Sequence, residues 1–327
     1  MKAAVYERYG PPNVVEVKEV EKSAIKDDEV LIRIRATTVS SGDWRVRSLD
    51  MPLGFGLLAR PILGFFGPRQ PILGAELAGD IEAVGKDVTK FKVGDAVFAF
   101  PGASLGCHAE YRAMPEGGAI ALKPASLSYE EAAALSFGGT TALDFLKTKG
   151  NIQRGEKVLV IGASGTVGSA AVQLAKHFGA EVTGVCSTAN LGLVTSIGAD
   201  KVIDYTKEDF VKNGKTYDII FDAAGTTSFS HCKGSLNENG RLLMVLAGLP
   251  AMAQIPWAAL TSNKKVFAGP AAESVQDFFV IKELAEAGAF KPVIDRYYPL
   301  EQIVEAHAYV DTGHKKGSVV ITVERHD

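Results

Sequence analysis

A glycine-rich turn near the middle of the chain carries the clearest chemical pattern in the sequence. It reads, in order, Gly162-Ala163-Ser164-Gly165-Thr166-Val167-Gly168. Gly165 and Gly168 match the second and third glycines of the pattern G-x-G-x-x-G, and Ala163 stands at the first. The second glycine lets the backbone approach a pyrophosphate, and the third lets a helix lie close to the preceding strand. Amides at the start of that helix hold the phosphates, so the turn predicts binding of a nicotinamide dinucleotide.

The same turn has a simpler interpretation, in which it joins a strand tightly to a helix and binds nothing. Its surroundings favour the cofactor. An apolar run at residues 157–161 precedes the turn, and residues 166–178 place Val167, Ala171 and Leu174 on one helical stripe. Further strand and helix patterns alternate as far as residue 268. This alternation predicts an α/β fold with a doubly wound parallel sheet.

The residues at the end of the second expected strand bear on the choice of cofactor. Folds that bind NAD usually place an acidic residue there, about 20 residues after the turn, for the ribose 2′-hydroxyl. Here the strand ends in Val185-Cys186-Ser187-Thr188, with no acid. A 2′-phosphate would meet no repulsion and would find hydroxyl donors in Ser187 and Thr188. The sequence therefore favours NADPH, with NADH as the second choice; in the alternative, both hydroxyls only cap the next helix.

The patterning divides the chain into three parts. Residues 1 to about 123 show β-branched runs joined by turns, with strands expected at 14–20, 30–36, 81–84 and 96–100. In the second part, Ser128 is expected to cap a helix. Its strands are expected at 157–161, 181–185, 201–203, 217–223, 241–246 and 265–268, with helices at 166–178, before Ile197 and near Glu208. The third part, from about residue 271, is expected to hold helices at 274–287 and 300–310 and a strand at 318–323.

Composition and charge exclude several classes of protein. The 327 residues carry a formal net charge of -3, so no broad basic surface invites nucleic acid. No apolar run reaches the roughly 18 residues that a membrane span needs, so we expect no membrane partner either. Residues 1–9 lack the apolar core of a signal peptide. Three cysteines without CxxC spacing are typical of a reducing compartment, which predicts a cytoplasmic location.

Short motifs along nearly the whole chain carry a family resemblance. They are MKA at 1–3, LGAELAG at 73–79, FKVGDAV at 91–97, AEY at 109–111, GGTTA at 138–142, the glycine turn, GAD at 198–200, VIDY at 202–205 and GHKKG at 313–317. The sequence thereby resembles the medium-chain dehydrogenase/reductase superfamily, specifically its zinc-free, quinone-oxidoreductase (zeta-crystallin-like) branch. The resemblance implies a Rossmann domain at 124–270, inserted into a GroES-like, mostly β catalytic domain formed by residues 1–123 and 271–327.

The resemblance also bears on metal. Zinc-dependent members carry a catalytic Cys, a His in Gly-His-Glu and a third Cys or acidic ligand. Here Ser40 stands near the Cys position and Ala75 replaces the His. Three scattered cysteines cannot form the four-cysteine structural zinc lobe. No family-type zinc is therefore expected, and Cys107-His108 and His231-Cys232 are expected to be ordinary fold residues.

For the reacting groups, the resemblance points to the loop that holds Ser40 and Asp43. Ser40 would donate a hydrogen bond to a substrate carbonyl or to a cofactor hydroxyl. Asp43 either takes part in the site or, as we favour, holds the loop through backbone amides. Residues 44–55 contain no Tyr of the kind that some relatives have, so the proton donor stays open, with water as one candidate. His108 either donates to substrate or, as we favour, is satisfied within the fold.

The resemblance and the glycine turn together define the expected cofactor site. Its residues are Thr140, Gly162, Ser164, Gly165, Thr166, Val167, Gly168, Ser187, Thr188, Tyr205, Ala247, Gly248 and Lys316. Thr140 would lie beside the nicotinamide, with capping of its helix as the alternative, and Tyr205 would contact the 2′-phosphate. Related NADPH enzymes often have a Lys shortly after strand two, which is missing here; Lys207 or Lys316 would compensate. Ala247 and Gly248 would flank the nicotinamide.

One apolar segment has no role in this scheme. Residues 52–71 are rich in Leu, Phe and Gly. They form either a wall that admits a hydrophobic substrate or a surface loop tucked on the core. Their apolar character favours burial or a ligand over free solvent.

These features predict a zinc-independent, NADPH-dependent oxidoreductase that transfers hydride to a quinone or an α,β-unsaturated carbonyl. The chain would orient a small hydrophobic substrate and exclude water. Because few catalytic groups are in view, the alternative is a sensor or scaffold that binds NADPH with little catalysis. Similar proteins often dimerise through the edge strand of the parallel sheet, which makes residues 265–268 the candidate interface of a homodimer.

Overall fold

The chain folds into two compact units, as seen in a computed structural model that describes residues 1–323. The first, called here the mixed-β unit, comprises Met1–Met51, Gly56–Phe137 and the described residues from Ser274 onward. The second, the parallel-sheet unit, comprises Pro52–Phe55 and Gly138–Glu273. The last four residues of the expected C-terminal domain segment lie outside the described residues.

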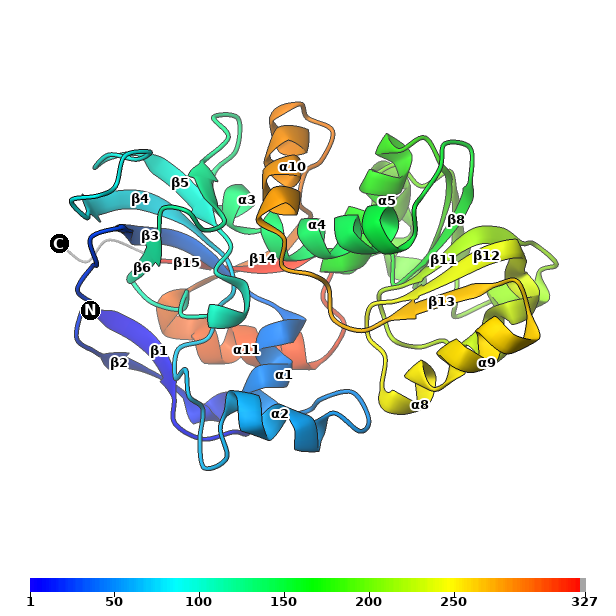
Figure 1. The fold of residues 1–327 in the computed structure, drawn as a ribbon, viewed down its shortest axis with the longest axis horizontal. Helices are drawn as coiled ribbons and strands as arrows, with labels where there is room; N and C mark the ends of the chain where they lie inside the picture. Colours follow the sequence, from blue (N-terminus) through cyan, green and yellow to red (C-terminus); the bar gives the residue numbers. More distant parts are fainter. Residues whose placement is uncertain (324–327) are drawn as a thin grey trace. The chain divides into compact units, whose positions relative to one another are not determined.

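The parallel-sheet unit is built on six parallel strands in the order β10-β9-β8-β11-β12-β13, of which Figure 1 labels β8, β11, β12 and β13. These are β8 (Lys157–Ile161), β9 (Glu181–Cys186), β10 (Lys201–Asp204), β11 (Tyr217–Asp222), β12 (Leu236–Met244) and β13 (Lys265–Ala268). The order reverses between β8 and β11, where sheets of this kind bind ligands at the carboxyl ends of the strands. The central strands are apolar and buried on both faces, as Val158 to Val160 of β8 show. The predicted doubly wound sheet is confirmed.

The helices of this unit lie between its strands in sequence, apart from α4, which precedes β8. They are α4 (Ser136–Leu143), α5 (Thr166–His177), α6 (Leu191–Ser196), α7 (Phe229–Cys232), α8 (Leu249–Met252) and α9 (Gln254–Thr261). Helix α4 begins in the mixed-β unit and continues into the parallel-sheet unit. The predicted helix near Glu208 is wrong, because only a short 3-10 helix forms, at Phe210–Lys212. Asp204 and Asp209 accept the amides of Thr206 and Val211, and such side-chain bonds to the backbone compete with helix formation.

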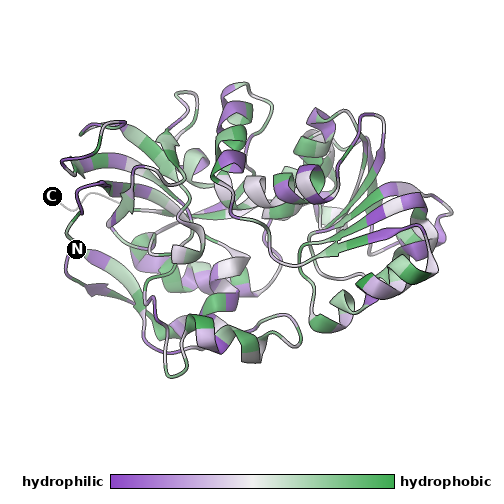
Figure 2. Cartoon of the chain, in the orientation of Figure 1, coloured by the Kyte–Doolittle hydropathy of each residue, from purple (hydrophilic) through white to green (hydrophobic). Residues whose placement is uncertain are grey.

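The mixed-β unit contains a seven-stranded sheet with the path β14-β15-β3-β4-β5-β7, in which β6 also pairs with β3, and a separate β1-β2 pair. The strands are β1 (Lys2–Tyr6), β2 (Val15–Glu19), β3 (Glu29–Val39), β4 (Leu77–Val84), β5 (Ala96–Ala99), β6 (Tyr111–Pro115), β7 (Ile120–Leu122), β14 (Ile294–Pro299) and β15 (Ser318–Thr322). Figure 2 shows hydrophobic colour along the strands of both sheets. Long β3 is the central support, since it pairs with β15, β4 and β6.

Five helices complete the mixed-β unit within the described residues. They are α1 (Ser41–Ser48), α2 (Gly56–Leu63), α3 (Tyr129–Ala133), α10 (Val275–Glu286) and α11 (Ile303–Asp311). Ser128 caps α3 as predicted, by accepting the amide of Glu131. A fully buried Arg47 of α1 donates to Asp311 of α11 at 2.5 Å, which ties these helices together. No helix within residues 1–323 is both long and apolar enough to cross a membrane.

Candidate functional site

The glycine turn joins β8 to α5 in the parallel-sheet unit. Gly162 has a φ of 76°, a left-handed conformation that glycine adopts without strain. Its amide donates to the carbonyl of Val185 at 3.1 Å, and the amide of Gly165 donates to the Gly162 carbonyl at 3.0 Å. Gly165 is also the N-cap residue of α5. Amides in a first helical turn lack partners within the helix, so this end of α5 can bind a phosphate.

Gly168 leaves no room for a side chain. A Cβ at this position would lie 2.0 Å from the carbonyl oxygen of Gly162. Helix α4 approaches the same place, since a Cβ on Gly138 would lie 2.8 Å from the carbonyl oxygen of Thr166. The start of α5 is therefore fixed by two backbone approaches that only glycine permits.

Thr140 lies within α4 and is 3% exposed. It is the fifth residue of that helix, so the alternative that it caps the helix is wrong. Its place beside the nicotinamide stays a prediction.

Asn190 connects the glycine turn to the end of β9. Its Nδ2 donates to Ser164 Oγ at 3.1 Å and to Ser187 Oγ at 3.2 Å. The side chain is 8% exposed, and its Oδ1 has no hydrogen-bond partner within residues 1–323. A buried carbonyl oxygen without a donor costs free energy unless a ligand or water supplies one. An unused acceptor between these two serines fits a ligand rich in hydroxyls, as a dinucleotide is.

The hydroxyls at the end of β9 do not cap the following helix. Ser187 stands at the N-cap position, but its side chain accepts no backbone amide. Thr188 donates its hydroxyl to Asp204 Oδ2 at 2.5 Å. The capping alternative is therefore wrong, and the Thr188 hydroxyl is held by a carboxylate.

Asp204 supplies an acid close to the end of β9, although β9 itself ends without one. Parallel pairing sets Asp204 of β10 beside Cys186 of β9. Hydrogen bonds from Thr188 and Thr206 lower the pKa of Asp204 to about 2, so its carboxylate is ionised at neutral pH. Lys207 Nζ lies 3.5 Å from Asp204 Oδ2 and offsets this charge in part. This carboxylate is a group that the sequence argument for NADPH did not include.

The other predicted cofactor residues of this unit lie at the ends of neighbouring strands. Tyr205 directly follows β10, and its side chain is 61% exposed. Ala247 is buried after β12, and Gly248 is the N-cap of α8. The segment Pro52–Phe55 lies against this end of β12, because the amide of Leu249 donates to the carbonyl of Leu53 at 2.8 Å.

Asp222, which the sequence argument did not single out, shapes the loop after β11. Its fully buried carboxylate accepts the amides of Ala224, Gly225 and Thr227 at 2.8–3.0 Å. Burial raises the pKa of Asp222, and these amides act against that rise. A Cβ on Gly162 would lie 3.1 Å from the Cβ of Ala224, so the loop lies against the glycine turn. In the sequence, Asp222 at the end of an apolar run, followed by Ala223, Ala224 and Gly225, could have indicated this role.

Ser40 and Asp43 form a closed pair at the start of α1 in the mixed-β unit. Ser40 Oγ donates to Asp43 Oδ2 at 2.6 Å, and the Ser40 amide donates to the same oxygen at 2.8 Å. The Asp43 amide donates back to Ser40 Oγ at 3.2 Å. Asp43 Oδ1 accepts the amide of Gly74 at 2.8 Å. Asp43 thus holds two loops through backbone amides, and the proton of the Ser40 hydroxyl is directed to Asp43.

Glu76 is a second buried carboxylate of the mixed-β unit, and the sequence argument gave it no role. It is 1% exposed. It accepts the hydroxyl of Thr38 at 2.6 Å and the amide of Phe137, in the first turn of α4, at 2.7 Å. Burial raises the pKa of Glu76 to about 7, and nearby Asp43 raises it further, against the lowering by these donors. Burial also lowers the pKa of Lys315 to about 8, an effect that the charge of Glu76 opposes.

The remaining candidate groups of the mixed-β unit have structural partners. His108 is fully buried, and its Nε2 lies 2.8 Å from the carbonyl oxygen of Thr38. Its Nδ1 has no hydrogen-bond partner within residues 1–323, so the interpretation we favoured, a histidine satisfied within the fold, holds for one ring nitrogen only. Lys316 is exposed, and its amide donates to Asp295 at 2.8 Å. It belongs to a different unit from the glycine turn. Across residues 1–323, no group of three or more His, Cys, Asp or Glu side chains could hold a metal ion.

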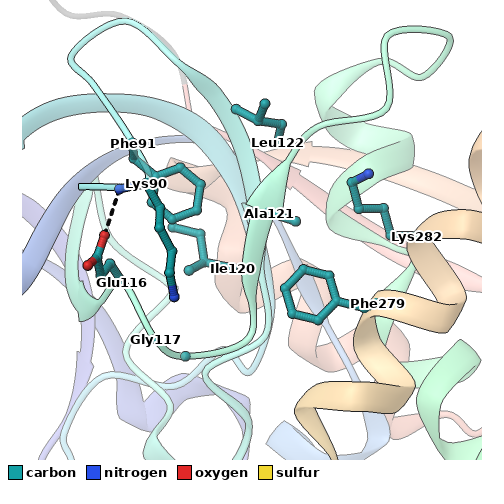
Figure 3. Close-up of a pocket in the computed structure, with 10 residues that line it drawn as sticks. Lys90, Phe91, Glu116, Gly117, Ile120, Ala121, Leu122, Phe279 and Lys282 are labelled. Carbon is teal, nitrogen blue, oxygen red and sulfur yellow. Dashed lines mark hydrogen bonds between the residues drawn. The ribbon is translucent and has the colours of Figure 1, made fainter. Parts of the chain in front are cut away.

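An open pocket of about 270 Å³ lies on the mixed-β unit, lined by α10, by β7 and by the loops that precede β5 and follow β6 (Figure 3). Phe279, Ile120 and Leu122 give it an apolar wall. Lys90, Lys282 and Glu116 are the charged residues of its lining. None of the predicted site residues lines it, so it is separate from the candidate site.

Comparisons with known proteins agree with this fold. The profile of the alcohol dehydrogenase GroES-like domain matches residues 26–124, and that of the zinc-binding dehydrogenases matches residues 197–321. A chloroplastic quinone-oxidoreductase homolog of Spinacia oleracea is 32% identical over 98% of both chains. A chloroplastic NADPH-dependent alkenal/one oxidoreductase of Arabidopsis thaliana is 31% identical over 98% of this chain and 79% of its own. The solved quinone oxidoreductase of Coxiella burnetii superposes with a TM-score of 0.86 at 26% identity, over 99% of both chains.

A GroES-like unit together with a dinucleotide-type parallel sheet defines the class as the medium-chain oxidoreductases. The chain belongs to the medium-chain dehydrogenase/reductase superfamily, in its quinone-oxidoreductase-like branch. The resemblance noted in the sequence is confirmed.

Two alanine substitutions in the glycine turn separate folding from binding. We expect Gly168→Ala to lower the free energy of unfolding by at least about 2 kcal/mol, because its Cβ would overlap the Gly162 carbonyl. Gly165→Ala is the matched control for folding, since its Cβ would lie 3.5 Å from that oxygen and its φ is -79°. It should keep the stability and weaken dinucleotide binding, because it fills the approach to the phosphates. Urea unfolding measures the stability of each variant, and fluorescence titration measures its affinity for the dinucleotide. Equal stability of the two variants would contradict the steric explanation.

The buried Glu76 predicts a pH dependence of stability. Its folded pKa of about 7 lies above the ordinary value of 4.5, so the native state holds a proton that the unfolded state has lost. Stability should therefore fall as pH rises from 4.5 to 7 and then level off. Relative to Glu76→Gln, the wild type should lose roughly 3 kcal/mol across this window, at about 1.4 kcal/mol per unit. Chemical unfolding at several pH values measures this, and parallel pH profiles would contradict it.

Proposed function

We propose that this protein is an NADPH-dependent oxidoreductase that reduces quinones or α,β-unsaturated carbonyls without zinc. The observation that carries the proposal is the glycine turn, with the unused Asn190 acceptor beside it, in a chain of the quinone-oxidoreductase-like branch. Two relatives are named for these activities, one as a quinone-oxidoreductase homolog and one as an NADPH-dependent alkenal/one oxidoreductase.

The proposed cofactor site lies in the parallel-sheet unit. We propose that the amides of Gly165 to Gly168 hold the pyrophosphate, while Ser164, Ser187 and Thr188 face the adenosine ribose. The remaining proposed cofactor residues of this unit are Thr140, Gly162, Tyr205, Ala247 and Gly248. Lys316, which belongs to the mixed-β unit, stays a prediction from the sequence. When bound, NADPH supplies a hydride to the substrate.

The proposed contribution of the mixed-β unit, which contains most of the catalytic domain expected at residues 1–123 and 271–327, is to orient the substrate. Ser40 and Asp43 are the candidates for its reacting loop, with Asp43 as the residue that holds the loop in place. Because the Ser40 proton is directed to Asp43, solvent water is the proposed proton donor to the substrate. The chain then lowers the barrier by orientation and exclusion of water.

The hydrogen bond between Ser40 and Asp43 also favours a second candidate function. If the Ser40 hydroxyl stays engaged with Asp43, the chain offers the substrate few polar groups. A sensor or scaffold that binds NADPH with little turnover would need none.

Two further proposals concern the setting of the protein. β13 is an edge strand of the parallel sheet, which makes Lys265–Ala268 the proposed interface of a homodimer. Cys107, Cys186 and Cys232 are buried thiols, in keeping with a reducing compartment such as the cytoplasm. The relatives above carry chloroplastic names, so the compartment is a matter for localisation experiments.

Steady-state assays distinguish the two candidate functions. We expect oxidation of NADPH, followed by its absorbance, with a short-chain quinone, an enal or an enone as acceptor. Fluorescence titration should show that NADPH binds in either case. Tight NADPH binding without turnover on any of these acceptors would contradict the enzyme and support the sensor.

The Asp204 carboxylate predicts how the choice of cofactor can be changed. Asp204→Asn removes a negative charge next to Thr188, so the KM for NADPH should fall about fivefold while that for NADH changes less than about twofold. Lys207→Ala is the opposing variant, because it removes the cation 3.5 Å from Asp204, and should raise the KM for NADPH. Equal changes with both cofactors would show that Asp204 has only a structural role.

A further inference from the structure

Helix α2 and the turn after it expose an unusual number of large apolar side chains. Leu58 is 57% exposed, Ile62 72%, Phe65 58% and Phe66 105%. Leu58 and Ile62 are four residues apart and so share one face of α2. The apolar character of this segment favours burial or a ligand, yet none of these four side chains is buried within the described chain. We call Leu58, Ile62, Phe65 and Phe66 the apolar patch.

The charged residues within the segment that carries the apolar patch are of one sign. Arg60 and Arg69 are the only charged residues between positions 51 and 75, and both are exposed. Arg60 donates to the carbonyl of Phe65 at 3.1 Å, which brings its guanidinium to the turn. Burial raises the pKa of Tyr9, and Arg60 and Arg69 both act to lower it, so both cations lie near this phenol.

The turn is anchored to the rest of the mixed-β unit. Tyr9 donates its hydroxyl to the carbonyl of Gly64 at 3.0 Å. A Cβ on Gly67 would lie 2.8 Å from the carbonyl oxygen of Glu7, so the chain around Glu7 lies directly against the turn. The Glu7 carboxylate is paired with Lys18 at 3.2 Å and adds no unpaired negative charge. The turn beside the apolar patch is therefore anchored to the mixed-β unit, while the side chains of the patch are exposed next to Arg60 and Arg69.

We propose that the apolar patch, with Arg60 and Arg69, docks this protein on the surface of an anionic lipid bilayer. Exposed Leu, Ile and Phe side chains enter the boundary between headgroups and acyl chains, while flanking arginines bind lipid phosphates. The absence of acids from residues 51–75 provides the charge complementarity. Eight residues of helix cannot span a bilayer, which needs about 20, so the segment lies on the surface. The sequence-based expectation of no membrane partner concerned spanning segments and did not consider this mode.

Docking would serve the proposed function if the acceptor is a lipophilic quinone dissolved in the bilayer. That consequence rests on the proposed function, whereas the docking itself does not. The two are separable, because vesicle binding is measured without cofactor or acceptor.

Vesicle flotation tests the proposal with the full-length protein. The vesicles contain phosphatidylcholine with about 30% phosphatidylglycerol, or phosphatidylcholine alone. We expect the wild type to float with the anionic vesicles and much less with the neutral ones, and high salt should weaken the binding. Phe65→Ser with Phe66→Ser should weaken binding at least tenfold. Arg60→Gln with Arg69→Gln should weaken it about fivefold per arginine.

Matched controls lie elsewhere on the same unit. Val93→Ser changes another exposed apolar residue, and Lys86→Gln with Lys90→Gln removes two exposed cations. Both should bind vesicles like the wild type. Absence of wild-type binding, or equal binding by the Phe65/Phe66 variant, would overturn the proposal. So would light scattering that shows this variant converting an oligomer to a monomer, since the patch would then be an interface between copies. Turnover of a water-soluble quinone should be the same in wild type and variant; its absence in both would count against the proposed function alone.

Discussion

The approach of the Gly168 backbone to the Gly162 carbonyl is the constraint on which the rest of the site depends. With only 2.0 Å available to a Cβ, any side chain at residue 168 would push α5 away from β8. That close spacing sets the first turn of α5 directly over the strand end, where its amides are available to a phosphate. The loop after β11 lies against Gly162, and Gly138 of α4 lies against Thr166, so segments distant in sequence pack closely on this turn.

Buried carboxylates hold loops in place within each of the two units. Asp222 accepts three backbone amides of the loop after β11. Asp43, at the start of α1, accepts the amide of Gly74, and Glu76 accepts the amide of Phe137 in the first turn of α4. A buried carboxylate without donors is expensive, so each must be satisfied by the backbone that it organises. Loop geometry and side-chain ionisation are therefore linked at Glu76, whose pKa burial raises to about 7.

The sequence predicts the parallel-sheet unit well, because its strands are short apolar runs separated by clear helical stripes. All six of its strands appear, and the glycine turn connects the predicted strand and helix. The helix near Glu208 fails because Asp204 and Asp209 use nearby amides. β14 has no apolar alternation and was not predicted; it forms because it pairs with β15.

In the candidate site too, contacts between residues distant in sequence could not be predicted. Ser187 and Thr188 could be named from their position after β9, but Asp204 could not, because strand pairing and not sequence distance brings it there. Glu76 meets Phe137 across 61 residues of sequence, which no local pattern encodes. The exposed apolar patch is a different case. Its composition could be read from the sequence, whereas its exposure required the fold.

A crystal structure of the protein with NADPH tests the central claim most directly. The account predicts the pyrophosphate against the backbone amides at the start of α5, with a donor from the cofactor or a bridging water on Asn190 Oδ1. A pyrophosphate bound elsewhere, with the first turn of α5 left to solvent, would contradict it.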